Sequence, residues 1–320
     1  MAELLRVDNI GKNFGGLAAL KDVDFAIDAG EIVGLIGPNG AGKTTLFNVI
    51  TGIYPPSSGA VTFDGKVIAR ARRQSALVTI VSLAGLAATL AAFIVGERYW
   101  WTLGGAAAAA GGVAVLFTAV GLAFAPRGGL RPDHVAGRGL YRTFQNINLF
   151  DELSAEENVE VGGHLTSRAG MLDSVFLTPR HVRSEREGRE RARAAIGFVG
   201  LEGKEQALAA ALPYGSQRRL EIARALVSRP KLLLLDEPAA GLNPTEKNDL
   251  LDLIRKTRDR GVTVLLIEHD MKLVMNVCDR VVVLDHGVAI AAGQPADVQR
   301  NPCVVEAYLG SRAAHCEVTK

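Results

Sequence analysis

The chain has 320 residues, a formal net charge of +2 at pH 7 and a mean hydropathy of +0.17. So small a net charge gives no electrostatic argument for a nucleic-acid-binding protein, and we predict no nucleic-acid partner. The cysteines Cys278, Cys303 and Cys316 lack the spacing of metal ligands, which argues against a zinc-binding module. The length suits one large domain or two small ones.

Residues 4–30 predict a small β region at the start of the chain. Residues 4–10 and 23–27 alternate between apolar and polar side chains, as half-buried strands do. Phe14 lies between these segments, where its ring could stack on the face of an adenine base. A core position at the end of a strand is an equally good interpretation of this residue alone.

Residues 37–44 form a glycine-rich segment, Gly-Pro-Asn-Gly-Ala-Gly-Lys-Thr, which matches the pattern G-x-x-x-x-G-K-[ST] at every fixed position. The apolar run at 31–36 predicts a buried strand before it, and residues 44–50 predict a helix after it. Glycines let backbone N–H groups surround a phosphate, and a helix N-terminus adds partial positive charge. We therefore favour a nucleoside triphosphate site over a chance glycine-rich turn.

Two side chains of this loop have expected roles of their own. Lys43 would reach the β- and γ-phosphates of the nucleoside triphosphate, and the hydroxyl of Thr44 would bind Mg²⁺. The full set of nucleotide contacts expected here is Gly37, Pro38, Asn39, Gly40, Ala41, Gly42, Lys43, Thr44 and Thr45.

Two long uncharged segments follow, from Ser75 to Val95 and from Tyr99 to Ala125. Each is about as long as the ~20 residues that a membrane-spanning helix needs. Arginines flank the pair on both sides: Arg70, Arg72 and Arg73 before it, Arg127 and Arg131 after it. The positive-inside rule then predicts an apolar helical hairpin with both ends in the cytoplasm. A buried soluble helix pair is the alternative, but the segments lack the polar face of such helices.

The soluble character returns from residue 137. Residues 139–146 predict a short strand whose polar end contains Gln145. Ser154 and Glu157 have the spacing of a capping box, which predicts the start of a helix that continues toward His164.

A charged region and a second glycine turn come next. Residues 180–212 predict two helical stretches, the first dense in Arg and Glu. Such a charge run is most simply a solvated helix face, with nucleic-acid binding as the minor alternative. In residues 212–226 a turn containing Gly215 leads into an amphipathic helix, whose N-terminus is another candidate phosphate site but a weak signal by itself.

Two buried strands end in polar residues. Residues 231–238 predict a strand that ends at Asp236 and Glu237. Asp236 could hold Mg²⁺ through water, and Glu237 could accept a proton from an attacking water; a solvent-facing acid pair is the alternative. The strand predicted at 262–267 ends just before His269, which would be taken as structural if it stood alone.

The order of these motifs resembles that of ATP-binding cassette (ABC) ATPases. They are Phe14, the loop at 37–44, Gln145, the Leu212–Gln217 turn, Asp236 with Glu237, and His269. Other stretches resemble the ATPase subunits of branched-chain amino acid importers, namely 142–146, 214–226, 239–244, 268–275 and 301–310. The resemblance covers the chain apart from about residues 71–130.

The resemblance implies an α/β fold of the P-loop NTPase class, with an antiparallel β subdomain and a helical subdomain at about residues 151–228. The ABC ATPase domain is then expected to comprise residues 1–70 and 131–311. The apolar hairpin at 71–130 would be an insertion, and residues 312–320 a tail.

The resemblance also implies how the motifs work together. Two subunits of such ATPases sandwich two ATP molecules, each between the P-loop of one subunit and the signature turn of the other. Phe14 would then stack on adenine. The implied catalytic residues are Glu237 as general base, His269 at the γ-phosphate, and Gln145. The implied Mg²⁺ ligands are Thr44, Gln145 and Asp236, and the further nucleotide contacts are Tyr214, Gly215, Ser216, Gln217 and Asn243.

Two features depart from the family pattern. Pro213 and Tyr214 stand where the usual signature has Ser and Gly, so the γ-phosphate contact would fall more on the Gly215 N–H. The second departure is the hairpin, because these ATPases are normally peripheral. We expect the chain at the cytoplasmic face of the inner or cell membrane, anchored there by residues 75–125.

The expected function is ATP hydrolysis that drives import of branched-chain or related amino acids. The partners would be a second ATPase subunit, identical or different, and transmembrane permease subunits, with an external solute-binding protein acting indirectly. An importer of urea or amides is one alternative. A non-transport ABC ATPase usually has two cassettes or a coiled-coil insertion, and an inactive subunit would not be expected to keep Lys43, Glu237 and His269.

Overall fold

The computed structural model describes residues 2–71, 112, 130–164 and 179–309. The chain divides into two compact units, Met1–Arg70 together with Leu130–Lys320, and Ala71–Gly129. The second unit lies almost entirely outside the described residues, and so does the predicted hairpin. Within the described part of the chain, no helix combines the length and apolar character needed to cross a bilayer.

An antiparallel sheet of four strands, in the order β2-β1-β4-β5, begins the first unit. Its strands are β1 (Glu3–Phe14), β2 (Leu17–Asp28), β4 (Ser58–Phe63) and β5 (Lys66–Arg70). The predicted alternation is confirmed at residues 23–27, where Val23, Phe25 and Ile27 are buried. At residues 4–10 it is interrupted, because Asp8 and Asn9 are both exposed where the pairing register shifts between Val7 and Ile10. Both β1 and β2 run further than predicted, up to a turn at residues 15–16, because backbone pairing also accommodates exposed polar residues.

The second sheet has six strands in the order β10-β9-β3-β8-β7-β6. They are β3 (Ile32–Ile36), β6 (Leu140–Arg142), β7 (Leu232–Asp236), β8 (Thr263–Ile267), β9 (Arg280–Asp285) and β10 (Val288–Gly293). All neighbours pair in parallel except β9 and β10. Strands β3, β7 and β8 are buried along their whole length, which explains their uninterrupted apolar sequences.

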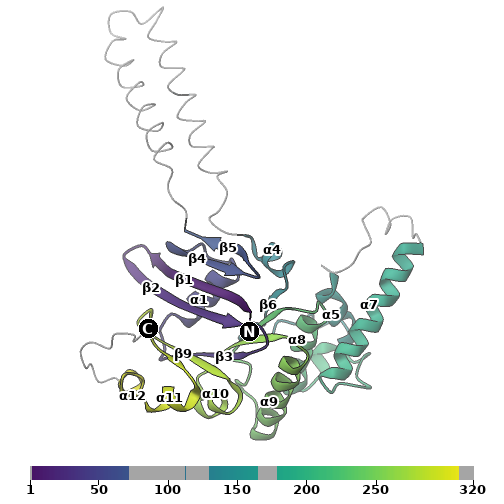
Figure 1. The fold of residues 1–320 in the computed structure, drawn as a ribbon. Coiled ribbons are helices and arrows are strands. Elements are labelled where there is room, and N and C mark those ends of the chain that lie inside the picture. The colour runs from purple at the N-terminus through teal and green to yellow at the C-terminus, as the bar shows by residue number, and fades with distance from the viewer. Residues whose placement is uncertain (1, 72–111, 113–129, 165–178, 310–320) are drawn as a thin grey trace, which may run out of the picture. The chain divides into compact units, whose positions relative to one another are not determined.

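Helix α1 (Lys43–Ile50) lies between the two sheets (Figure 1). Its side chains Leu46, Phe47, Val49 and Ile50 are fully buried. They belong to one core cluster that contains residues of both sheets. The loop at 37–42, which is predicted to bind phosphate, is therefore held at both ends by buried elements, β3 before it and α1 after it.

Three helices pack together to form a helical region. They are α5 (Ala155–Gly162), α7 (Pro179–Phe198) and α8 (Tyr214–Leu226) (Figure 1). The capping box at Ser154 and Glu157 is confirmed, since each residue's side chain bonds to the other's backbone N–H. The second helix predicted within 180–212 is wrong. Gly200 and Gly203 both have positive φ, which a helix does not allow. Beyond them only the 3₁₀ turn η3 (Ala209–Ala211) forms.

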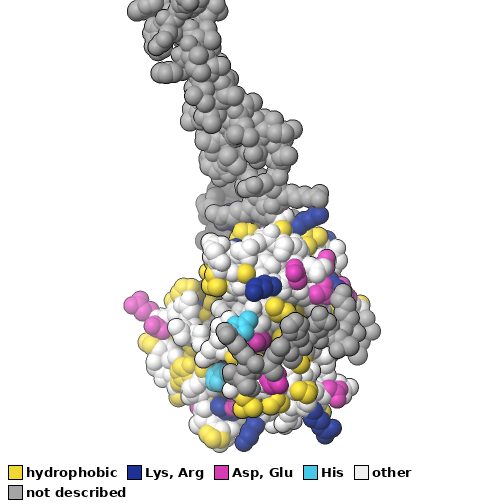
Figure 2. All heavy atoms as spheres, turned by 90° about the vertical axis from the view of Figure 1, so that its left-hand side faces the viewer, with side chains coloured by type: hydrophobic (Ala, Val, Ile, Leu, Met, Phe, Trp, Pro, Cys, Tyr) yellow, Lys and Arg dark blue, Asp and Glu magenta, His cyan; other side chains and the backbone are white. Residues whose placement is uncertain are grey.

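Five further helices lie in the described part of the chain, four of them after β7. They are α4 (Pro132–Ala136), α9 (Pro244–Asp259), α10 (Met271–Val277), α11 (Pro295–Arg300) and α12 (Pro302–Leu309). On the face of the molecule in Figure 2, basic and acidic side chains are interspersed rather than gathered by sign. A surface of this kind offers no broad basic patch on the side shown.

We predict that Ser154→Ala lowers the free energy of unfolding by about 1 kcal/mol, because the N-cap hydroxyl that accepts from the Glu157 N–H is lost. Chemical denaturation followed by circular dichroism measures the change. Thr245→Ala, in the exposed first turn of α9, is the matched control and should change stability little. Equal effects of the two substitutions would contradict the capping role.

Candidate functional site

The loop between β3 and α1 has the backbone form that its glycines allow. Gly37, Gly40 and Gly42 have φ values of 149°, 81° and 100°. A Cβ atom on Gly37 would collide with the carbonyl oxygen of Leu284, and one on Gly42 would lie 2.8 Å from that of Ala19. Substitution would therefore force neighbouring backbone apart, which fits a loop built to bring N–H groups close to a ligand.

Lys43 is buried at the start of α1, with 9% of the residue exposed. Its Nζ donates to the carbonyl oxygens of Gly37 at 2.6 Å and Pro38 at 2.9 Å. Burial lowers the pKa of Lys43, and the nearby carboxylates of Glu237 and Asp236 act in the opposite direction. The ammonium group thus lies against the loop itself, on the side of the acids.

The predicted catalytic residues meet beyond the carboxyl ends of β7 and β8. Gln145 donates its Nε2 to Oε2 of Glu237 at 2.9 Å. The Nδ1 atom of His269 lies 3.8 Å from the same oxygen. Because parallel strands end at a common edge, residues far apart in sequence converge here.

Glu237 has a backbone conformation that non-glycine residues rarely adopt, with φ of 46°. Its N–H donates to the carbonyl oxygen of Ile267 at 2.9 Å, which ties the residue to the end of β8. Such strain persists where the surrounding structure enforces it, and here the hydrogen bond to Ile267 is one such restraint.

Glu268 is a buried acid that the sequence patterns did not single out. It is 1% exposed, and its carboxylate accepts N–H groups from Ala239 at 2.8 Å and from His269 at 3.3 Å. Burial raises the pKa of Glu268, while the Ala239 hydrogen bond and His269 lower it. The side chain therefore joins the segment after Glu237 to the segment that carries His269.

The predicted Mg²⁺ ligands fit a hard cation by their chemistry. Thr44 offers a hydroxyl, Gln145 an amide oxygen and Asp236 a carboxylate, and such cations prefer oxygen ligands. Asp236 is 4% exposed, and its Oδ2 accepts a hydrogen bond of 2.6 Å from Arg142. Among the described residues, no group of three His, Cys, Asp or Glu side chains is arranged for a metal, so any Mg²⁺ site would depend on mixed ligands.

Phe14 lies at the surface rather than in the core. The residue is 42% exposed, and its ring meets that of Tyr54 edge-on, with centroids 5.3 Å apart. The Nζ of Lys12 lies 4.9 Å from the centre of the Phe14 ring. This exposure favours the adenine-stacking interpretation over the core alternative. Tyr54 was not identified from the sequence, because its partner is distant along the chain.

The signature turn packs against the loop that follows β7. The ring of Tyr214 lies over Gly241, where an added Cβ would be 3.0 Å from Cε1 of the ring. Gln217 donates Nε2 to the carbonyl oxygens of Ala209 and Leu212, so it holds the turn. The side chain of Asn243 accepts from the N–H of Glu246 and caps α9. Gly215 and Ser216, at the start of α8, are buried.

A buried ion pair on α8 holds the segment that carries Gln145. Arg218 and Glu221 are 0% and 2% exposed, and their side chains are 2.8 Å apart. Arg218 donates to the carbonyl oxygens of Phe144 at 2.9 Å and Gln145 at 2.7 Å, and Glu221 accepts from the Phe144 N–H. Burial raises the pKa of Glu221, and Arg218 counteracts it. Sequence patterns gave no signal for this clamp.

Helix α12 reaches the loop between β3 and α1. Burial raises the pKa of the Tyr308 hydroxyl, and a hydrogen bond from the backbone of Gly37 acts in the opposite direction. The resemblance drawn from residues 301–310 did not predict this contact.

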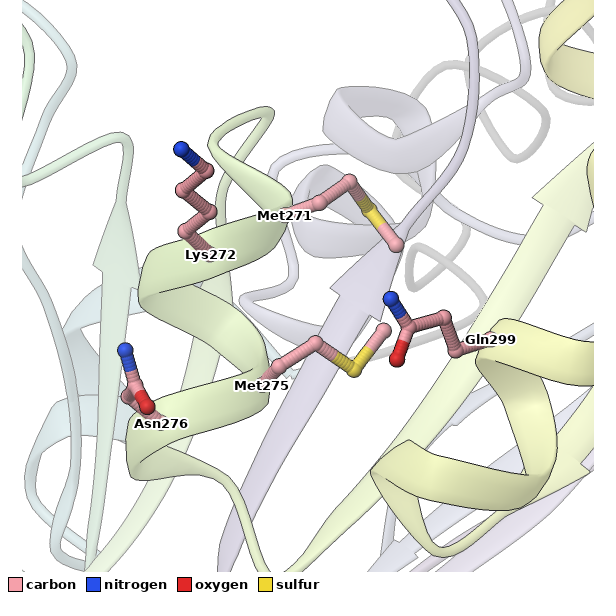
Figure 3. A pocket seen from close by; sticks show the side chains of 5 residues that line it. All are labelled: Met271, Lys272, Met275, Asn276 and Gln299. Carbon is pink, nitrogen blue, oxygen red and sulfur yellow. The ribbon is translucent and has the colours of Figure 1, made fainter.

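A cavity of about 270 Å³ lies beside α10, close to α11 (Figure 3). It is lined by Met271, Lys272, Met275, Asn276 and Gln299. Met271 and Met275 point their side chains toward Gln299. None of the predicted nucleotide-binding residues lines this cavity, and its side chains carry no acid or histidine for catalysis.

The fold and the residues gathered at the ends of β3, β7 and β8 define a P-loop ATPase of the ABC type. The family model described as "ABC transporter" matches residues 20–123 and 129–240. A model described as "Branched-chain amino acid ATP-binding cassette transporter" matches residues 290–314. The chain therefore belongs to the ABC transporter family, as the resemblance of its motifs predicted.

Two curated relatives match nearly the whole chain. The high-affinity branched-chain amino acid transport ATP-binding protein BraF of Pseudomonas aeruginosa is 39% identical, with 96% of this chain and 98% of that protein covered. The corresponding protein LivG of Escherichia coli is 36% identical over the same shares. A solved ATP-binding cassette of an ABC transporter, in its ADP conformation, has a TM-score of 0.69 and 28% identity, with 97% of this chain and 100% of that chain covered.

We predict that Arg218→Met lowers the free energy of unfolding by about 3 to 5 kcal/mol, because it leaves the Glu221 carboxylate buried without its partner. The double variant Arg218→Met/Glu221→Leu should be more stable than the single one, since no unpaired charge remains. Urea denaturation of both gives the comparison.

The exposed ion pair of Arg183 with Glu187 provides the control, because Arg183→Met there should change little. If the double variant is no more stable than Arg218→Met, the unpaired carboxylate of Glu221 does not account for the loss of stability.

Proposed function

We propose that this chain is the ATP-hydrolysing subunit of an ABC importer for branched-chain or related amino acids. The substrate class is supported by two ATP-binding proteins of branched-chain amino acid transport, which are 39% and 36% identical over 96% of this chain. Like other cassettes, the chain would pair with a second ATPase subunit and with transmembrane permease subunits on the cytoplasmic side of the membrane. An external solute-binding protein would act indirectly.

The geometry supports the following roles for the binding residues. The exposed ring of Phe14 would stack on adenine, and the backbone N–H groups of residues 39–45 would surround the phosphates, with Pro38 shaping the loop. Lys43 would exchange its hydrogen bonds to the loop carbonyls for bonds to the β- and γ-phosphates. Thr44, Gln145 and Asp236 would hold Mg²⁺, which neutralises charge on the phosphates when it is bound.

The chemical step would use the cluster at the end of β7. Glu237, whose side chain is 24% exposed, would accept the proton of the attacking water. Gln145, already bonded to Glu237, would orient that water, and His269 would contact the γ-phosphate. The signature residues Tyr214 to Gln217, together with Asn243, would contact the ATP that is bound to the P-loop of the other subunit.

We predict that Glu237→Gln lowers the rate of ATP hydrolysis by at least about 100-fold while ATP binding persists, because only the proton acceptor is removed. Phosphate release and binding of a fluorescent ATP analogue measure the two quantities. Glu202→Gln, at an exposed position, is the control. Equal hydrolysis by parent and Glu237→Gln proteins would rule out the base assignment.

Solute uptake by cells lacking this chain tests the substrate class. Uptake of labelled leucine, isoleucine or valine should fall and should return with the parent chain but not with Glu237→Gln. If leucine uptake is unaffected while urea or amide uptake is lost, the alternative importer is correct.

We also propose that residues 75–125 anchor the subunit in the bilayer. The support is the sequence alone: two uncharged segments of membrane-spanning length between arginine-rich flanks. Membranes that lack the permease should keep the chain after an alkaline carbonate wash, whereas a chain without residues 75–125 should be released. Release of the full-length chain would reject the anchor.

A further inference from the structure

Arg142, at the end of β6, is a buried charge to which the nucleotide motifs assign no role. Its side chain is 8% exposed. The Nη2 atom donates to Oδ2 of Asp236, and the Nη1 atom donates to Oδ1 of Asn48, both at 2.6 Å. Burying a guanidinium is costly unless its hydrogen bonds are well made, so two such short bonds mark a built arrangement.

Aromatic rings restrict the same guanidinium group. The ring of Phe47, from α1, has its centre 5.4 Å from Cζ of Arg142, and the ring of Phe144 lies 5.5 Å away. Phe47 is fully buried, which fixes its position. A planar cation held near two rings and bonded to two acceptors has little freedom to turn.

The acceptors connect Arg142 to the elements that carry the predicted Mg²⁺ ligands. Asn48 lies four residues after Thr44 on α1, so both side chains occupy the same face of that helix. Asp236 is bonded directly, and Gln145 follows Arg142 by three residues. Arg142 is therefore connected to the three segments that carry the predicted Mg²⁺ ligands Thr44, Asp236 and Gln145.

We propose that Arg142 is a positioning residue which fixes the carboxylate of Asp236, and its distance from Thr44, for binding of a divalent cation with ATP. The inference rests on the proposed nucleotide site. Arg142 donates to Oδ2 of Asp236, so Oδ1 would be the oxygen available to the hydration shell of the cation. Partners that orient metal ligands in this way typically contribute 10- to 100-fold to metal affinity.

Arg142 also brings positive charge, which by itself would weaken binding of a cation. The variant Arg142→Lys separates the two effects, because lysine keeps the charge but cannot bond Asn48 and Asp236 through a rigid fork. Positioning predicts weaker cation binding in this variant, whereas a pure charge effect predicts no change.

The experiment uses the full chain with Mn²⁺ as a probe and a non-hydrolysable ATP analogue. Electron paramagnetic resonance measures Mn²⁺ affinity of the nucleotide-bound protein, and fluorescence titration measures nucleotide affinity without metal. For Arg142→Lys we expect at least about a 10-fold loss of Mn²⁺ affinity, with metal-free nucleotide affinity within about 2-fold of the parent. Arg138→Lys, which alters a half-buried arginine of the same segment, should match the parent in both.

Parental Mn²⁺ affinity in Arg142→Lys overturns the proposal, and so does an equal loss of metal-free nucleotide binding, which would mark a structural role. Should that variant not fold, Asn48→Ala gives the same test by removing the second anchor. A parent protein without metal-dependent nucleotide binding would instead refute the proposed function.

Discussion

The parallel pairing of β3, β8 and β7 is the constraint on which the rest of the site depends. Their register is set by pairs such as Ile32 with Val264 and Leu232 with Thr263. All three strands are buried throughout, and each ends where its sequence turns from apolar to glycine or charged residues. A shift in the pairing register of β7 would move the carboxylate of Asp236 away from the Arg142 guanidinium, and a buried carboxylate without a partner is costly. Burial and charge together therefore fix which residues meet at the edge.

Exposure separates the roles of the acids that converge there. The side chains of Asp236 and Glu268 are 5% and 1% exposed, and both accept hydrogen bonds from fixed donors. The side chain of Glu237 is 24% exposed, and its contacts with Gln145 and His269 leave it open on the solvent side. Water can reach this carboxylate more readily than the other two. The same residue has a left-handed backbone, so local strain and the most exposed of the three carboxylates coincide at Glu237.

The sequence predicted the parts of the site that depend on local pattern. The glycine spacing of the loop, the buried strands and the acids at their ends each follow from short-range physics, and the strands were placed within a few residues. The role of Arg142 was not recognised, because both of its partners, Asn48 and Asp236, lie 94 residues away along the chain. Arg218 has Glu221 three residues further on, but the carbonyl oxygens of Phe144 and Gln145 that it holds lie 74 and 73 residues away, and only the fold brings them together. The second helix expected within 180–212 does not form, because Gly200 and Gly203 adopt turn conformations that periodicity does not detect.

The two buried arginines act on the same short segment, residues 142–145, through different elements. Arg142 holds one end of it to α1 and β7, while Arg218 and Glu221 hold the backbone of residues 144–145 to α8. The side chain of Gln145 extends from this piece to Glu237. A displacement of α8 relative to the sheet would therefore act directly on the backbone of Gln145, against the restraint at Arg142. Packed elements tend to switch between discrete arrangements rather than stretch, so the contact of Gln145 with the acid would follow the position of α8.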